Sequence, residues 1–435
     1  MTRPMIIHGY EHKTSFCVLY PEDEKRMKQF IASHPKPERL GLYENHEGFT
    51  PGNYIGMVWL DKGDNRTVLR VDSKFPIMDY VAMYAECAAH PIIGERLHCL
   101  HVWPDQDLIE TRGGEFSDLV VIAYLRELNE LCRRHMRRHF LRERQNFIGK
   151  MKGKIIIGEN LRRNTIHARP DRIYCEYQSV SDDILENQIL RTALERAARY
   201  SATYRDRKNT LGVLQQWIRA SRAALNGVST RKVKPGDFAV ARKRGSFAFY
   251  KRPLELAKAV LLKLGPNPQA KDSQTQTPPF ALDSAELFER YAEIKFLEDS
   301  ENFGGLLPGK NIGSPDAGDF NVKVRPDFYV PDKETPHIID AKYKNLNFSD
   351  TETGDNNEES KPPRDDMYQV VAYSQHLGLL EEMKCDDENA IKLGLAYPYI
   401  GESEESVISR KQTRAFMSPL IVYGIPCPTK HNEDN

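Results

Sequence analysis

The chain has 435 residues, of which 40% are hydrophobic, 29% charged and 9% aromatic, and its 62 basic residues balance its 62 acidic residues. This composition is typical of a globular protein rather than a fibrous or disordered one, and the length predicts two or three folding units. No stretch approaches the roughly 20 apolar residues that span a bilayer, and the first residues lack the apolar core of a secretory signal. Because the seven cysteines are scattered and form no Cys-x-x-Cys pair, we expect a cytoplasmic protein without a disulfide framework, a thiolate metal site or a membrane partner.

Basic residues are concentrated in the middle of the chain. Residues 133–252 contain 29 Lys and Arg against 10 Asp and Glu. A solvated helical face would explain a short basic run, but a bias over 120 residues is typical of a surface that attracts nucleic acid. The candidate DNA-binding residues are Arg133, Arg134, Arg137, Arg138, Arg242, Lys243 and Arg244.

Short apolar runs predict a β-rich N-terminal domain over residues 1–112. The candidate strands lie at residues 16–20, 54–60 and 67–71. The turn-forming residues 61–65 predict that the last two strands form a hairpin.

A basic, largely helical middle region is predicted over residues 113–265. Its first helix, over residues 116–144, has an apolar stripe and an arginine-rich end on which His135 and His139 lie one turn apart. Asp183 and Glu186 form a capping-box pattern that opens a helix reaching residue 200. The other predicted elements are a buried strand at 154–157, a strand at 172–177 and helices at 210–225 and 250–264.

Residues 266–280, rich in Pro, Gln, Ser and Thr, predict a linker before a C-terminal domain at 281–427 and a polar tail at 428–435. The acidic residues 349–364 predict a disordered insertion in this domain. The predicted helices lie at 284–298 and 365–380, and the predicted strands at 322–330, 337–343, 391–399 and 420–423.

Charged residues interrupt two of these apolar strands. Asp340 and Lys342 are two residues apart and point to the same face of their strand, and antiparallel pairing would bring Asp327 near Asp340. Exposed charges on a hairpin are the alternative, but the apolar neighbours predict a buried sheet, where such charges are costly unless they are paired or bind a metal. The two carboxylates and the carbonyl of Ala341 are ligands suited to Mg²⁺ or Mn²⁺.

These residues resemble a known family. Arg325-Pro-Asp327 followed by Asp340-Ala-Lys342 is similar to the PD-(D/E)XK nuclease motif, and residues 339–344 resemble the McrC family, the nuclease subunit of the McrBC 5-methylcytosine-dependent restriction systems. Leu287-Phe-Glu289 resembles the first catalytic-domain helix of the family, and residues 368–373 resemble its Gln-x-x-x-Tyr element. The resemblance covers residues 115–425 and is thin before them.

The resemblance implies an α/β (α+β) protein with a C-terminal restriction-endonuclease-like domain whose central mixed sheet is flanked by helices. It implies a type II/IV-like restriction endodeoxyribonuclease in which Asp327 and Asp340 bind Mg²⁺ and Lys342 orients the attacking water or stabilises developing charge. In this reading Glu289 acts as an outer ligand, and Gln369 helps to position Lys342 or the phosphate. It also implies two partners. One is an AAA+ GTPase of the McrB type, to which the N-terminal domain binds and whose GTP hydrolysis it stimulates. The other is DNA, whose methylation the GTPase recognises. The alternatives are a free-standing repair or recombination nuclease and a non-catalytic adaptor of a motor.

Two further patterns are set aside. Residues 304–310 match half of a phosphate-binding loop, but Asn311 replaces the Ser or Thr that would hold Mg²⁺, so we expect this chain to bind no nucleotide. His98 and His101 are possible soft-metal ligands, but satisfied or exposed side chains are the simpler interpretation.

Overall fold

The computed structural model describes residues 5–11, 42–45, 48–59, 67–103, 106–107, 109–112, 115–201, 208–262, 274–312, 323–331, 336–346, 361–383, 391–400, 409–415 and 418–430. By its internal contacts the chain divides into two units. The first unit combines residues 1–109 with residues 278–435, and the second consists of residues 110–277. Both units contain helices and strands, in agreement with the predicted mixed α/β class.

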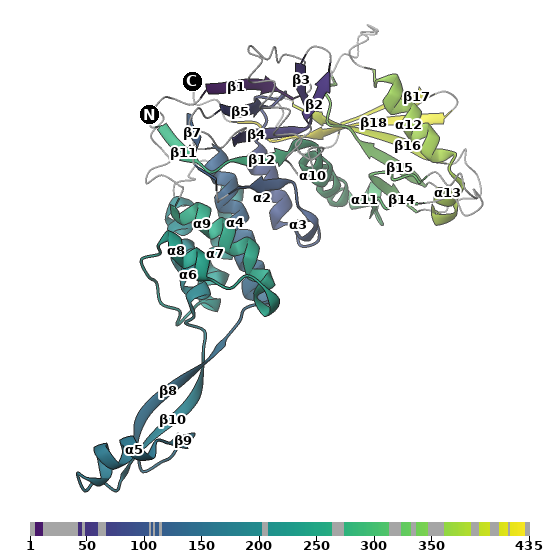
Figure 1. Ribbon diagram of the computed structural model, residues 1–435. Coiled ribbons are helices and arrows are strands. Elements are labelled where there is room, and N and C mark those ends of the chain that lie inside the picture. Colours follow the sequence, from purple (N-terminus) through teal and green to yellow (C-terminus); the bar gives the residue numbers. More distant parts are fainter. Residues whose placement is uncertain are drawn as a thin grey trace. The chain divides into compact units, whose positions relative to one another are not determined.

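The first sheet of the first unit combines strands from both segments of its sequence (Figure 1). In sheet order it consists of β1 (Met5–Tyr10), β5 (Thr67–Asp72), β4 (Tyr54–Trp59), β12 (Phe280–Asp283) and β6 (Leu100–Val102). The pairing of β1 with β5 is parallel, and the other three pairings are antiparallel. The antiparallel β4 and β5 confirm the predicted hairpin pairing. A separate small sheet is formed by β2 (Leu42–Asn45) and β3 (Gly48–Pro51).

The second sheet of this unit is six-stranded and mixed. In sheet order it consists of β13 (Leu307–Pro308), β14 (Phe328–Val330), β15 (His337–Ala341), β16 (Lys392–Tyr399), β18 (Ser418–Pro426) and β17 (Ser409–Ala415). The pairings of β15 with β16 and of β16 with β18 are parallel, and the others are antiparallel. Each of the four ranges predicted here contains a strand, but β14 covers only residues 328–330 of the predicted 322–330, and β15 ends two residues before the predicted end at 343. The two edge strands, β13 and β17, were not predicted.

Helices contribute apolar side chains to both faces of this sheet. On one face, Phe296 of α10 (Ser284–Glu298) makes edge-on ring contacts with Phe328 and Tyr423. On the other face, Tyr329 and Val422 belong to a core cluster with residues of α12 (Arg364–Ser374) and α13 (Leu377–Met383). Neighbouring residues of a strand point to opposite faces, so each strand supplies both cores. The predicted helix 365–380 is divided in two, with α12 ending at Ser374.

The helix α10 begins where β12 ends. The side chain of Asp283, the last residue of β12, accepts hydrogen bonds from the backbone amides of Ala285 and Glu286 at 3.1 and 3.0 Å. The predicted helix 284–298 is thereby confirmed. The short α11 (Ser300–Phe303) follows it.

The N-terminal segment contains a helix that was not predicted, α2 (Tyr80–Ala89), followed by α3 (Ile93–Arg96). Asp79 caps α2 by accepting hydrogen bonds from Val81 and Ala82 at 3.0 Å. Seven of its ten residues are buried. A helix that is apolar on most of its surface has no clear 3.6-residue periodicity, which explains why the sequence pattern did not indicate it.

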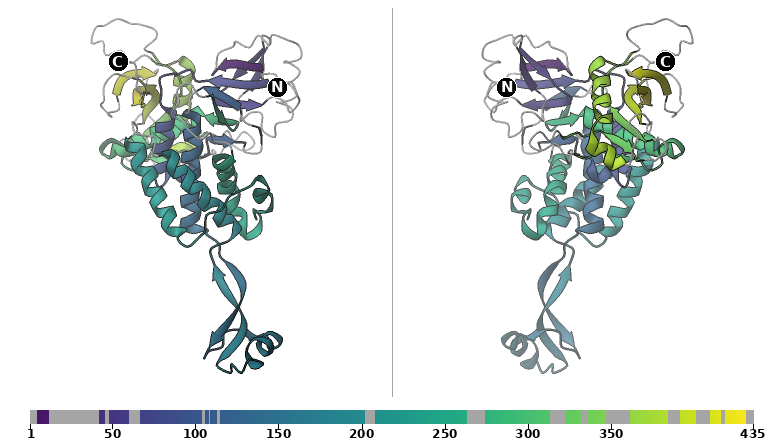
Figure 2. Two further views of the ribbon diagram at one scale, coloured as in Figure 1. Left: turned by 90° about the vertical axis from the view of Figure 1, so that its left-hand side faces the viewer. Right: turned by 90° about the vertical axis from the view of Figure 1, so that its right-hand side faces the viewer.

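The second unit consists of a group of helices and a separate three-stranded sheet (Figures 1 and 2). Its helices are α4 (Glu115–Arg134), α6 (Leu185–Ser201), α7 (Lys208–Ala224), α8 (Pro235–Val240), the 3-10 helix η3 (Gly245–Tyr250) and α9 (Lys251–Leu262). Strands β7 (Ile109–Arg112) and β11 (Gln274–Thr277) pair with each other. No helix in the described ranges combines the length and apolar character needed to cross a bilayer.

The long hairpin of the second unit corrects the predicted helix 116–144. The helix α4 ends at Arg134, and β8 (His139–Ile148) pairs antiparallel with β10 (Arg172–Ser181) over their full length. The apolar stripe of the helix ends at Leu131, so nothing beyond it holds a further turn against the core. His139 therefore lies on a strand rather than one helical turn from His135, and the predicted histidine pair is wrong.

The segment between β8 and β10 forms the end of this hairpin, which we call the hairpin tip (residues 149–171). It contains β9 (Lys154–Ile155), α5 (Ile157–Asn160) and a π-helix, η2 (Leu161–Thr165). The predicted buried strand at 154–157 is wrong, because β9 has two residues and the side chain of Ile157 is 72% exposed. Figures 1 and 2 show the tip lying away from the helices of its own unit.

Two other local predictions are corrected. The Asp183 carboxylate does not cap α6, because it accepts hydrogen bonds from Ser229 and Gln188, and Glu186 pairs with Arg242 instead. Part of the predicted linker 266–280 is ordered structure, since β11 and the first residue of β12 lie in it. The candidate strand 16–20, the turn 61–65, most of the acidic insertion and the start of the linker lie outside the described residues.

We expect Gly56→Ala to destabilise the first unit. Gly56 has a φ of +146°, and a Cβ atom built on it would lie 2.3 Å from the carbonyl oxygen of Phe280 on β12. Both the strained backbone and the clash oppose the pairing of β4 with β12, so the free energy of unfolding should fall by about 2–4 kcal/mol. Urea unfolding measures the change.

The matched control is Gly212→Ala in α7, where the added Cβ meets nothing within 4 Å. Alanine favours a helix interior, so this variant should be unchanged or slightly more stable. Equal stability of Gly56→Ala and the wild type would contradict the close approach of the two strands.

Candidate active site

The predicted acidic residues meet where β14 and β15 pair. The antiparallel register pairs Phe328 with Ile339, so Asp327, one residue before β14, lies opposite Asp340. The backbone amide of Ala341 donates a hydrogen bond to Oδ2 of Asp327 at 2.7 Å. Asp340 is almost completely buried, with 2% of its surface exposed.

Lys342 connects these carboxylates to α12. Its ammonium forms an ion pair with Oδ2 of Asp340 and donates a hydrogen bond to Oε1 of Gln369 at 2.7 Å. Gln369 in turn donates to the hydroxyl of Tyr373 at 2.5 Å. Gln369 and Tyr373 are four residues apart and share one face of α12, as the Gln-x-x-x-Tyr spacing requires.

Burial is the main influence on the protonation of this group. It raises the pKa of Asp327 well above the ordinary value, and the nearby carboxylates of Asp340 and Glu289 raise it further. Burial also raises the pKa of Asp340, against the opposing effect of the Lys342 ammonium. For Lys342, burial lowers the pKa, but the Asp340 carboxylate outweighs it and the net shift is upward. Full ionisation of these carboxylates would therefore place more negative charge in the site than its lysine neutralises.

Glu289 approaches this group from α10. It forms an ion pair with Arg290 at 3.1 Å, and its pKa is raised by burial, against the effects of Arg290 and Arg325. Its carboxylate is close enough to raise the pKa of Asp327. The sequence-predicted residues Asp327, Asp340, Lys342, Glu289 and Gln369 therefore lie within electrostatic or hydrogen-bonding range of one another.

A further buried carboxylate near Asp340 was not predicted. Asp366, at the start of α12, forms an ion pair with Lys344 at 2.6 Å and accepts a hydrogen bond from the hydroxyl of Tyr397 at 2.9 Å. Its charge contributes to the raised pKa of Asp340. Lys344 lies two residues after Lys342, and this spacing is the one sequence signal for the ion pair between Lys344 and Asp366.

The arrangement offers oxygen ligands to a cation. Oδ2 of Asp340 is buried, and beyond its ion pair with Lys342 it accepts no hydrogen bond from the described residues. Within the described ranges, no three His, Cys, Asp or Glu side chains are grouped so as to hold a metal ion. A metal here would therefore have two side-chain ligands, Asp327 and Asp340, and would need the backbone carbonyl of Ala341 or water for the rest.

The candidate DNA-binding residues lie in the second unit, and most already have partners. Arg133 and Arg134 pair with Glu130, Arg138 pairs with Asp182, and Arg242 pairs with Glu186. Arg137 donates hydrogen bonds to Tyr250 and Ser246. The side chains of Lys243 and Arg244 form no ion pair or hydrogen bond with the described residues, and Arg244 is exposed.

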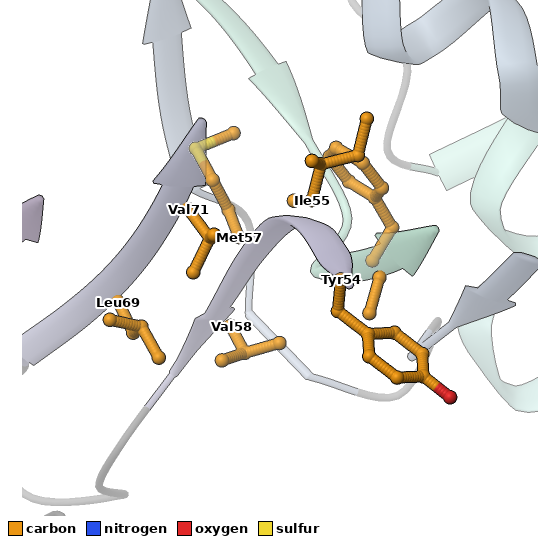
Figure 3. A pocket seen from close by; sticks show the side chains of 9 residues that line it. Tyr54, Ile55, Met57, Val58, Leu69 and Val71 are labelled. Atoms are coloured by element: carbon orange, nitrogen blue, oxygen red, sulfur yellow. The ribbon is translucent and has the colours of Figure 1, made fainter. Parts of the chain in front are cut away.

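Two other features carry no chemistry of this kind. A cavity of about 20 Å³ between β4, β5 and β12 is lined by apolar side chains, among them Ile55, Met57 and Val71 (Figure 3), and would hold about one water molecule. In the glycine-rich segment 304–310, Lys310 is ion-paired with Glu382 at 2.7 Å. The described residues that follow form a β-bridge at Ile312 rather than a helix.

Comparison with known proteins gives one family. The model of the family described as "McrBC 5-methylcytosine restriction system component" matches residues 50–382. No curated protein matches the sequence.

Two solved structures are similar at 16% identity. One is a refined half-complex from a tetradecameric assembly of Thermococcus gammatolerans McrB AAA+ hexamers with bound McrC, with a TM-score of 0.44, covering 97% of this chain and 94% of the other. The second is the cryo-EM structure of the Thermococcus gammatolerans McrBC complex, with a TM-score of 0.32, covering 67% of this chain and 88% of the other.

We expect Asp327→Asn to stabilise the metal-free protein at neutral pH. Because the folded-state pKa of Asp327 is raised, ionising it costs stability as the pH rises from the unfolded pKa through the folded one. Asparagine removes this cost and still accepts the hydrogen bond from Ala341. The gain should be about 1–2 kcal/mol at pH 7 and should shrink at about pH 3, below the ordinary aspartate pKa of 3.8, where the aspartate is mostly protonated in both states.

Urea unfolding in the presence of a chelator, at both pH values, measures this difference. Asp365→Asn is the control, because Asp365 is an exposed residue in the first turn of α12 and should show no gain. A loss of stability in Asp327→Asn at pH 7 would mean that the carboxylate is compensated by its neighbours.

Proposed function

Because the chain belongs to the family of McrBC 5-methylcytosine restriction system components, we propose that it is the nuclease subunit of such a system and hydrolyses DNA phosphodiesters. The observation that carries the proposal is the meeting of Asp327, Asp340 and Lys342 at the paired ends of two buried strands. The six-stranded mixed sheet with helices on both faces supports a restriction-endonuclease-like fold of the PD-(D/E)XK type for this part of the chain.

The roles follow from charge and position. Asp327 and Asp340 would hold Mg²⁺, or Mn²⁺, together with the Ala341 carbonyl. When bound, the ion would polarise a phosphoryl oxygen and lower the pKa of an attacking water. The raised pKa of Lys342 keeps its ammonium protonated, so it can stabilise negative charge that develops on the phosphate. Gln369 holds the lysine in place through the hydrogen bond at 2.7 Å.

Glu289 would act from outside this group. Its ion pair with Arg290 and its position on α10 favour a role in adjusting the electrostatic field of the site or in binding a metal-bound water. The basic second unit would add sequence-tolerant contacts to the DNA backbone. Lys243 and Arg244 are the best placed of the predicted residues for this, because they have no partner among the described side chains.

We also propose an AAA+ GTPase motor of the McrB type as the partner that recognises methylated DNA and supplies nucleotide hydrolysis. One similar solved structure is described as McrB AAA+ hexamers with bound McrC. Membership of the McrBC family supports this reading over a free-standing repair nuclease. A non-catalytic adaptor would share the family and is separated from a nuclease by experiment.

The hairpin tip is a candidate surface for this partner, in addition to the N-terminal segment. Ile157 and Ile166 are 72% and 71% exposed, and Met151 and Leu161 are exposed near them. Apolar side chains that are grouped and solvent-exposed are typical of surfaces that bind another protein.

The test of catalysis is Asp340→Ala in the complex with the motor, GTP, Mg²⁺ and methylated DNA. Cleavage should fall by roughly 1,000-fold, which corresponds to about 4 kcal/mol of lost transition-state stabilisation. Assembly with the motor and stimulation of its GTPase should persist, because Asp340 is buried away from any partner surface.

Asp365→Ala, which changes an exposed carboxylate on α12, is the matched control and should cut like the wild type. If Asp340→Ala cuts normally, the site is not catalytic. If the wild type stimulates the motor but never cuts, the protein is an adaptor.

The test of the hairpin tip is the double variant Ile157→Asp and Ile166→Asp. Charges on an apolar contact surface should weaken binding to the motor by about 100-fold, since truncated or charged anchors cost about 2 kcal/mol or more. Isothermal titration calorimetry measures the change. Val240→Asp is the control, because Val240 is 73% exposed on α8 of the same unit. Equal binding of the double variant and the wild type would place the motor contact elsewhere.

A further inference from the structure

A buried carboxylate from the N-terminal segment contacts Tyr343, which directly follows Lys342 in the chain. Glu11, at the end of β1, is 1% exposed. Its oxygens accept hydrogen bonds from Ser284, from Ser73 at 3.3 Å and from the hydroxyl of Tyr343 at 3.3 Å. The hydroxyl of Tyr80 on α2 is 2.6 Å from that of Tyr343 and also contacts Ser73. We call these five residues the hydroxyl cluster.

The side chain of Lys74 contacts the backbone of Tyr343. The ammonium donates a hydrogen bond to the carbonyl oxygen of Tyr343 at 2.6 Å and lies 4.2 Å from the centre of the Tyr343 ring. This is the one hydrogen bond that the described residues give to that carbonyl. Phe75 packs edge-on against the same ring, with the ring centres 5.0 Å apart.

The position of this contact matters because the sheet holds Lys342 on one side only. β15 ends at Ala341, and Lys342 keeps one backbone hydrogen bond to the neighbouring strand, from its amide to the carbonyl of Ala396 at 2.7 Å. The chain then turns, with the Lys344 amide donating to the Lys342 carbonyl at 2.8 Å. The direction in which Lys342 leaves the strand is therefore set by what holds the next residue, Tyr343.

We propose that Lys74 is a positioning residue for the nuclease: by binding the Tyr343 carbonyl it fixes the segment after β15, so that the Lys342 ammonium reaches Asp340 and Gln369. The inference rests on the proposed function, since it concerns the same site. It assigns to the N-terminal segment a part in catalysis, separate from any contact with a partner.

The surroundings of Lys74 disfavour the charged form of its side chain. Burial lowers the pKa of Lys74 to about 8, the Glu11 carboxylate opposes the shift, and the Lys344 ammonium adds to it. A methionine of similar length would remove the cost of burying the charge while keeping the side-chain volume. Fold stability alone therefore gives little reason for an ammonium at this position.

The experiment compares Lys74→Met, Lys74→Arg and Tyr80→Phe in the full chain bound to its motor. Two readouts are used: DNA cleavage kinetics, and hydrogen exchange of the backbone amides of residues 340–346. Lys74→Met should lower kcat by about 10- to 100-fold with KM unchanged, because a small displacement of a catalytic group has this effect. Exchange in residues 340–346 should become faster. Lys74→Arg keeps a charged donor and should restore most of kcat.

Tyr80→Phe is the structural control. It removes one hydroxyl from the hydroxyl cluster and should lower the thermal midpoint, yet it leaves the contact between Lys74 and the Tyr343 carbonyl and should leave kcat within about twofold.

The outcomes separate the two proposals. Unchanged exchange in residues 340–346 of Lys74→Met overturns the positioning role, whether or not the wild type cuts DNA. Unchanged kcat in that variant, with a wild type that cuts and an Asp340→Ala variant that does not, overturns it as well. Failure of the wild type to cut overturns the proposed nuclease, and the positioning role with it, even where the exchange is faster.

Discussion

The first unit keeps two aspartates, Asp327 and Asp340, close together with one lysine paired to Asp340, and local contacts compensate part of this charge. Removing ionised groups from water costs several kcal/mol for each ion unless partners replace the lost hydration. Asp327 accepts a hydrogen bond from the Ala341 amide, and Asp340 forms an ion pair with the Lys342 ammonium. Ala341 is the last residue of β15 and Lys342 follows it directly, so the charge and its compensation come together when β14 and β15 pair.

The unit that contains this site is built from segments that are far apart in the sequence. β12 lies between β4 and β6 in the five-stranded sheet, and its last residue, Asp283, caps the helix that carries Glu289. The six-stranded sheet and the N-terminal sheet thus belong to one unit, although residues 110–277 separate them in the chain. The site is built from the second segment but is held in part by the first, as the contact between Lys74 and Tyr343 illustrates.

The parts that the sequence predicts well are those determined by local chemistry. The helix α10 has its capping aspartate next to its first turn, and β14 and β15 contain short apolar runs that the charged residues adjoin. Residues 139–148 could not be assigned in this way, because a strand there depends on its partner, residues 172–181. The same holds for β12, whose neighbours in the sheet lie more than 170 residues earlier in the chain. The metal, the catalytic roles and the domain limits stay predictions.

The basic middle region shows why a charge count alone does not define a binding surface. The Arg242 guanidinium donates two hydrogen bonds to Glu186 at 2.9 and 3.0 Å, and Arg138 forms an ion pair with Asp182 at 2.8 Å, so both cations already have a carboxylate partner. A DNA phosphate at these positions would have to replace a carboxylate as the partner of the arginine. Because the two ion pairs are similar in strength, the exchange would add little to the free energy of binding. In the proposed function, the excess of cations would still attract DNA over a distance of about one Debye length. The cations without a carboxylate partner, such as Lys243, would therefore make the close contacts with the DNA phosphates. Such binding should be sensitive to salt and tolerant of sequence.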